Sequence, residues 1–157
     1  MPVSLVTLFV LISGNAILQS AADFFNSGTS KIGQRNYHEA IADFKQAIAL
    51  SPHFEPAWLS LAASKTQIGD DHSAILDLNQ LIKLNGASYD AYCMRGIIKS
   101  ILKDCAAAMR DFNTSIRINS KYAEAFYYRS NEFYFLNDTI NPQSDSKKAV
   151  TLGFKEN

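Results

Sequence analysis

Residues 21–54 read AADFFNSGTSKIGQRNYHEAIADFKQAIALSPHF, and this stretch decides the fold because the chain repeats its pattern. A shift of 34 residues superposes a large residue, a small residue four positions later, an alanine twelve further on, and a large residue after four more. The equivalent positions are Phe24, Trp58, Tyr92 and Phe126; Gly28, Ala62, Gly96 and Ser130; Ala40, Ala74 and Ala108; Phe44, Leu78 and Phe112. A period between about 20 and 50 residues predicts a stacked solenoid.

Each unit is predicted to form two helices. In the first unit Phe24, Gly28 and Ile32 are spaced by four residues and share one face of a helix. Asn36 is the expected N-cap of a second helix, and Pro52 follows the last turn of that helix, which it cannot continue. Small residues at the recurring positions let two helix backbones approach closely. Neither helix can bury its apolar stripe alone, so neighbouring units are expected to stack.

These units resemble tetratricopeptide repeats (TPRs), whose pattern has bulky, small, alanine and aromatic or leucine residues at positions 4, 8, 20 and 24. The resemblance covers about 130 of the 157 residues. It divides the chain into repeats at 21–54, 55–88 and 89–122, and a degenerate fourth repeat at 123–154. The implied fold is all-α: a right-handed superhelical solenoid of helix-turn-helix repeats with a C-terminal capping helix.

Pro142 breaks the pattern, because it stands where the other repeats have alanine. A proline inside a helix costs about 3 kcal/mol, so the last helix is expected to start at this residue. Asn141 as N-cap and Pro142 at the first helical position fit that start. The helix is expected to stop at Gly153 and to cap the solenoid with a polar outer face.

Residues 1–20, MPVSLVTLFVLISGNAILQS, carry no charged side chain. Residues 3–12 are almost entirely apolar, a run about half as long as a helix needs to span a bilayer. Small and polar residues follow the run, which is the pattern of a cleaved signal peptide. The sequence therefore predicts a periplasmic or secreted protein with no stable membrane span after cleavage. An uncleaved anchor and an extra helix packed on the fold are the alternatives for this segment, and a cytoplasmic protein is the alternative location.

The net charge and the residue motifs argue against several classes of function. The 15 basic residues balance the 15 acidic ones, which argues against nucleic acid as the main ligand. An S-x-x-K sequence at 100–103 lacks the motifs that accompany it in enzymes, and His38 and His72 lack a third metal ligand. We expect no enzymatic activity, no cofactor and no metal. The spacing of Cys93 and Cys105 in the repeat predicts two free thiols, Cys93 on the inner surface and Cys105 at a turn.

The TPR resemblance implies where a partner binds. In that family the first helices of the repeats line a concave groove, and positions 5, 9 and 12 face the ligand. The groove residues carried over are Phe25, Thr29, Ile32, Leu59, Ala63, Thr66, Cys93, Ile97, Ser100, Tyr127, Asn131 and Tyr134. Of the basic and amide groups that clamp a carboxylate terminus in chaperone-binding relatives, only Asn131 matches in kind. The resemblance therefore does not favour a carboxylate clamp.

Seven of the 18 aromatic residues fall within residues 122–135. One interpretation places Phe126 and Phe133 in the core, with Tyr128 and Phe135 under the capping helix. The other makes this end a docking site for an apolar or amphipathic segment, anchored by Tyr127 and Tyr134. The predicted function is a non-enzymatic protein- or peptide-binding module. The alternatives are a homodimer formed through the aromatic repeat, or a carrier of apolar small molecules with an enclosed pocket.

Overall fold

The computed structural model describes residues 19–135 and 142–155, and within these ranges every regular element is an α-helix. The helices are α2 (Ala21–Gly33), α3 (Tyr37–Leu50), α4 (Glu55–Gln67), α5 (Asp71–Leu84), α6 (Tyr89–Ile101), α7 (Cys105–Ile118), α8 (Ala123–Phe135) and α9 (Pro142–Thr151). The predicted all-α repeat fold is confirmed. The predicted signal segment lies outside the described residues except for its last two positions. None of the described helices is both long and apolar enough to cross a membrane.

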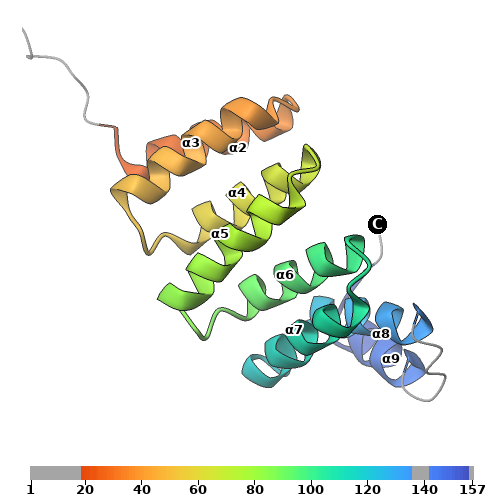
Figure 1. Ribbon diagram of the computed structural model, residues 1–157. Coiled ribbons are helices and arrows are strands. Elements are labelled where there is room, and N and C mark those ends of the chain that lie inside the picture. The colour runs from red at the N-terminus through yellow and green to blue at the C-terminus, as the bar shows by residue number, and fades with distance from the viewer. Residues whose placement is uncertain (1–18, 136–141, 156–157) are drawn as a thin grey trace, which may run out of the picture.

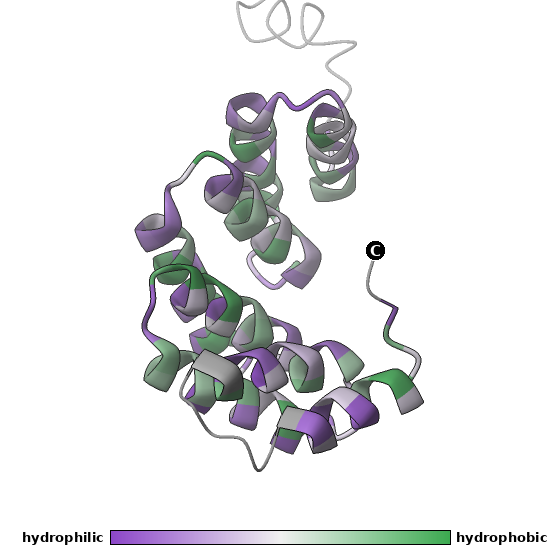
Figure 2. Ribbon diagram, turned by 90° about the vertical axis from the view of Figure 1, so that its right-hand side faces the viewer, coloured by the Kyte–Doolittle hydropathy of each residue, from purple (hydrophilic) through white to green (hydrophobic). Residues whose placement is uncertain are grey.

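Consecutive helices form four pairs that stack into a curved array (Figure 1). Helices α2, α4, α6 and α8 are the first helices of the pairs, and α3, α5, α7 and α9 are the second helices. Each first helix contacts its own partner and the neighbouring first helix, and from α4 onward it also contacts the second helix before it. The segment that follows α9 turns toward the open side of the curved array (Figure 2).

The junction between the helices of a pair is fixed by matched small and large residues. Phe44 and Phe112 are fully buried, and a Cβ atom added to Gly28 or Gly96 would lie 2.7 Å from the facing ring. In the second pair Ala62 occupies the glycine position, and the smaller Leu78 replaces phenylalanine in the same core cluster. The volumes of the two positions therefore compensate each other, as a densely packed interior requires.

Ion pairs at the same repeat positions reinforce the junctions of the first three helix pairs. Lys31 and Asp43 are 2.7 Å apart, and the residues 34 and 68 positions further along the chain pair in the same way. These further pairs are Lys65 with Asp77 and Lys99 with Asp111. Their carboxylates are largely buried, so both partners are needed to offset the cost of removing charge from water.

Arginines on the last two first helices join neighbouring pairs. The Arg95 guanidinium donates to both carboxylate oxygens of Asp111, at 2.8 and 2.6 Å, and to Asn79 of the preceding pair at 2.6 Å. Arg129 repeats this arrangement with Asp145 and Asn113. Planar guanidinium groups suit such two-point bonding, so the angle between these pairs is fixed by directional contacts.

The helix ends agree only partly with the sequence analysis. Helix α9 begins at Pro142 as predicted, while its expected cap Asn141 lies outside the described residues. Asn36 makes no side-chain capping bond, so the expected cap of α3 is not formed. The turn before it closes instead through backbone bonds, with Arg35 in the left-handed region at φ 61°. Helix α2 carries a full capping box between Ser20 and Asp23.

Candidate functional site

The predicted groove residues of α2 are divided between core and surface. The Phe25 ring packs 5.1 Å from the ring of Phe54 and 5.8 Å from that of Phe44, so it is partly buried. Ile32 packs against the same core cluster. Thr29 is exposed and donates its hydroxyl to the carbonyl oxygen of Phe25 at 2.9 Å. Of the three predicted groove residues at this end of the array, only Thr29 presents a polar side chain to a partner.

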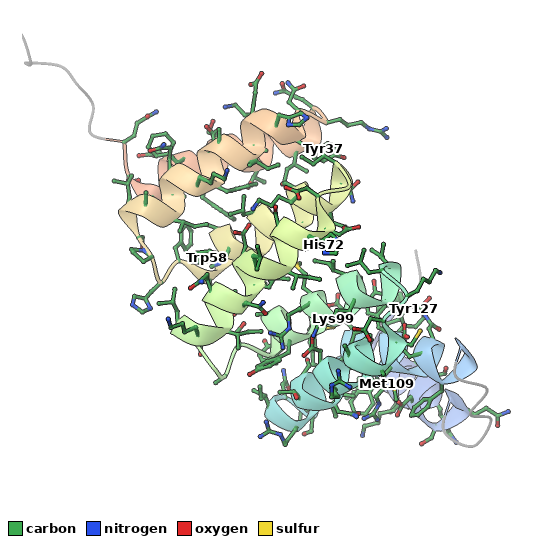
Figure 3. All side chains as sticks on the ribbon, viewed as in Figure 1. Tyr37, Trp58, His72, Lys99, Met109 and Tyr127 are labelled. Carbon is green, nitrogen blue, oxygen red and sulfur yellow. The ribbon has the colours of Figure 1, made fainter. Side chains whose placement is uncertain are left out.

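The groove residues of α4 are all partly buried. Leu59 lines a cleft described below, while Ala63 adds a small apolar patch one helical turn further on. Thr66 donates to the carbonyl oxygen of Ala62 at 3.2 Å. Trp58, at the same end of the helix as Leu59, donates its indole N–H to Pro52 and closes the loop before α4 (Figure 3).

Cys93 was expected to line the groove, but the structure buries it. Its side chain is 1% exposed and packs with Ala108, Phe112 and Ala125, so it offers no surface to a partner. The position is buried because α8 covers α6 here, and this burial also raises the pKa of the thiol. The neighbouring groove residue Ile97 packs against the same cluster.

The two thiols are free, as predicted. Cys105 is partly buried at the start of α7, and a hydrogen bond to the Glu132 carboxylate raises its pKa. Ser100, the last predicted groove residue of α6, donates its hydroxyl to the same carboxylate. Glu132 itself is 1% exposed, so this polar cluster joins α6, α7 and α8 from inside the fold.

In α8 the predicted contrast between two neighbouring aromatics is present. Phe126 is 9% exposed and belongs to the core, as expected. Tyr127 is partly buried, and its ring stacks on Phe154 with centroids 4.3 Å apart and planes inclined by 22°. Figure 3 shows Tyr127 on α8 near the end of the chain. Asn131 is partly buried, and the side chain of Tyr134 lies outside what the structure describes.

Tyr128 packs differently from the expectation that it lies under the capping helix. Its ring stacks on Phe112, with centroids 6.1 Å apart and planes inclined by 15°. Phe133 is partly buried, and the side chain of Phe135 lies outside the described residues. The aromatic concentration of this repeat therefore serves both the core, through Phe126 and Tyr128, and a surface, through Tyr127.

A cleft of about 410 Å³ opens where α4, α6 and the loop between α5 and α6 meet. Its apolar part is formed by Pro56, Leu59 and the ring of Tyr89. Its polar part is formed by Glu55, Asn85, Ser88 and Asp90. It is open to solvent, and so lacks the enclosure that a carrier of apolar small molecules needs.

Acidic and aromatic side chains continue from this cleft toward α8, and we call Glu55, Tyr89, Asp90, Tyr122 and Glu124 the inner rim. The Glu55 carboxylate accepts hydrogen bonds from Ser88 and, at 2.9 Å, from Asn85. The Tyr122 hydroxyl donates to Glu124. The rings of Tyr89 and Tyr122 meet edge to face with centroids 4.8 Å apart. These contacts fix the rim residues against one another.

The inner rim is electrostatically negative. Burial raises the pKa of Asp90, and the nearby carboxylates of Glu55 and Glu124 raise it further. Burial and the hydrogen bond to Glu124 raise the pKa of Tyr122. A cation placed at the rim would relieve the repulsion among the three carboxylates, so this surface favours a positively charged ligand group.

A second cleft, of about 320 Å³, lies at the other end of the rim. On one side it is formed by Tyr122, Ala123 and Glu124 at the start of α8. The other side belongs to the segment that follows α9, namely Leu152, Gly153, Phe154 and Lys155. The two clefts occupy equivalent ends of successive first helices.

Sequence reasoning missed most of the inner rim. Asp90 and Glu124 are 34 residues apart, so the repeat period itself carried a signal for them. Phe154 had no such signal, because it lies after the last repeat helix and contacts Tyr127 through a turn. No group of three or more potential metal ligands occurs in the part of the chain that the structure describes.

Comparison with known protein families gives one match, to the tetratricopeptide repeat model over residues 24–54. No curated protein sequence matches the chain. The matched segment contains α2, α3 and the loop to α4, which includes the Gly28–Phe44 junction.

Solved structures with the same fold are TPR proteins of low sequence identity. The first TPR domain of Spaghetti (RPAP3), solved with the HSP90 peptide SRMEEVD, is 21% identical with a TM-score of 0.70 and covers 76% of this chain and 94% of its own. YrrB, a TPR protein described as having an unusual peptide-binding site, is 16% identical with a TM-score of 0.68, and the match covers 85% of this chain and 69% of YrrB. TTC0263, a thermophilic TPR protein of Thermus thermophilus, is 16% identical with a TM-score of 0.75, and the match covers 85% of this chain and 75% of TTC0263.

Proposed function

We propose that this chain, which matches the tetratricopeptide repeat model at residues 24–54 and has the fold of TPR proteins, is a non-enzymatic module that binds an extended, basic segment of a partner protein along the inner rim. The observation that carries this proposal is the acidic and aromatic cleft between α4 and α6. Peptide-bound and peptide-binding structures among the proteins of this fold support the general role.

The acidic and aromatic side chains of the inner rim favour a basic partner segment. Asp90 and Glu124 stand at repeat position 2, where a carboxylate clamp would place a basic or amide side chain. An acidic peptide end would be repelled there, whereas lysine or arginine would pair with the carboxylates. The rings of Tyr89 and Tyr122 offer apolar surface, and they also suit the stems and charges of long basic side chains.

The geometry suits an extended segment. The two clefts lie at equivalent ends of successive first helices, with the Tyr89–Tyr122 pair between them. A bound chain could place alternate side chains in the clefts while its backbone passes over the tyrosine rings. Large aromatic surfaces fixed in place are the usual anchors of such interfaces.

Two labelled peptides of equal length, one alternating lysine with phenylalanine and one alternating glutamate with phenylalanine, test this proposal by fluorescence anisotropy. The lysine peptide should bind the full chain and the glutamate peptide should not. The double variant Asp90→Asn with Glu124→Gln should weaken lysine-peptide binding by about tenfold, because two rim charges are lost.

The matched control neutralises two exposed carboxylates away from the rim, through Glu39→Gln and Asp70→Asn. It removes the same net charge, so it should change binding of the lysine peptide by less than about twofold. Equal binding of both peptides, or equal weakening by the rim and control variants, would reject the inner rim as the binding surface.

A further inference from the structure

The segment after α9 folds back through a helix-terminating turn. Gly153 has a φ of 93°, its N–H bonds to Val150, and the N–H of Phe154 bonds to Ala149 at 3.0 Å. This pair of backbone bonds is a Schellman motif, and it directs the residue after the glycine toward the helix surface. The position of Phe154 is therefore set by the turn.

Phe154 fills a place that a partner could use. Its ring stacks on Tyr127, the aromatic residue of α8 that faces away from the core. Offset stacking of this kind contributes about 0.5–1.5 kcal/mol beyond the burial of apolar area. The next residue, Lys155, lines the same cleft as Glu124 of the inner rim. An aromatic residue followed by a basic one thus lies at the end of an acidic and aromatic surface.

We propose that Tyr127 and the cleft beside Glu124 form a subsite for an aromatic side chain followed by a basic one, and that Phe154 and Lys155 occupy it as an internal competitor. This inference rests on the proposed function, because it assigns one end of the same binding surface. A partner segment with an aromatic residue followed by a basic one binds in the subsite by displacing residues 153–155.

The competitor is effective because it is tethered. A short connection from α9 gives Phe154 an effective concentration near Tyr127 in about the millimolar range. The apparent affinity of an external ligand falls by the fraction of molecules in which the subsite is filled. The turn that ends α9 therefore sets the affinity that a ligand needs in order to displace Phe154 from the subsite.

The test uses the full chain and an acetylated, amidated and labelled peptide, TLGFK, that copies residues 151–155. The Phe154→Ala variant vacates the subsite without shortening the chain. It should bind the peptide about fivefold or more tightly than the unaltered chain. Adding Tyr127→Ala to this variant should abolish the gain. A control peptide, TLGAK, should bind neither protein.

Val150→Ala is the matched control, because Val150 is 70% exposed on the same helix and precedes the turn. It should leave peptide binding unchanged. Hydrogen exchange at the Phe154 amide of the unaltered chain provides a second measurement, since saturating TLGFK should accelerate it by displacing the segment. Equal peptide binding by the unaltered chain and Phe154→Ala, or no binding by either, would overturn the proposal.

The two proposals fail in different ways. Loss of lysine-peptide binding in the Asp90 and Glu124 double variant, with no gain in Phe154→Ala, would retain the inner rim and reject the internal competitor. A gain of TLGFK binding in Phe154→Ala, with lysine-peptide binding unchanged by the Asp90 and Glu124 double variant, would retain the aromatic subsite and reject the basic-segment surface between α4 and α6.

Discussion

The helix junctions and the inner rim lie on the same helices, but they differ in how strictly they repeat. In both the Gly28–Phe44 and the Gly96–Phe112 junction, a Cβ atom added to the glycine would lie 2.7 Å from the phenylalanine ring. Each cleft of the rim contains acidic residues of its own, but one is completed by Leu59 and the other by the residues that follow α9. Recurring positions therefore define the fold, whereas the two clefts differ in the residues that complete them.

The largest expected effect is at the junctions. Phe112→Ala empties a fully buried aromatic site and should lower the free energy of unfolding by about 3–5 kcal/mol. Urea unfolding followed by circular dichroism measures this loss. Leu76→Ala is the surface control, since Leu76 is 64% exposed. A similar midpoint for both variants would mean that the junctions do not carry the stability of the array.

A smaller effect is expected when a junction is overfilled. Gly96→Ala forces the Phe112 ring to move and should cost about 1–3 kcal/mol, partly offset by the better helix propensity of alanine. Adding Phe112→Leu reproduces the Ala62–Leu78 pair of the second repeat and should recover much of the loss. Thermal melts of the two single variants and the double variant measure the coupling. Additive losses would show that the two volumes are independent.

The smallest effect on stability is expected at the rim, and it has the opposite sign. The pKa of Asp90 is raised above its usual 3.8, so the folded chain binds a proton more tightly than the unfolded chain does. The free energy of unfolding therefore falls as pH rises from 3.8 through the raised pKa. Asp90→Asn removes this penalty and should raise the melting temperature at pH 7.

The pH dependence separates this explanation from a general change in packing. The stabilising effect of Asp90→Asn should shrink as pH is lowered through the raised pKa, because the aspartic acid then becomes neutral as well. Thermal melts of both proteins over a range of pH follow the difference. A difference that is constant with pH would show that neither burial nor the neighbouring carboxylates raise the pKa of Asp90 in the folded chain.

The junctions were predictable from sequence because they depend on local spacing. The 34-residue shift identified Gly96 and Phe112 as equivalent to Gly28 and Phe44, and the structure places each pair in contact. The start of α9 was predictable for a similar reason, since Pro142 can only begin a helix there. Both predictions used residue types and their spacing along the chain alone.

Features that depend on neighbouring repeats were harder to predict. The family pattern placed Cys93 on a groove surface, but its burial depends on how closely α8 covers α6. Asn36 has the chemistry of an N-cap, yet the tight turn at Arg35 places it without a capping bond. The contact between Tyr127 and Phe154 joins α8 to the segment that follows α9, so no periodic pattern indicated it.

The arginine links between neighbouring pairs imply that the array bends unevenly. Asn79 accepts from Arg95 and Asn113 accepts from Arg129, which ties α5 to α6 and α7 to α8 by directional bonds. At the joint between α3 and α4 the equivalent positions are Lys45 and Leu61, and Leu61 packs into an apolar cluster. Apolar contact is non-directional and tolerates small rotations. We therefore expect directional bonds to restrict rotation at the two later joints, and the curvature of the array to depend at the joint between α3 and α4 on apolar packing around Leu61.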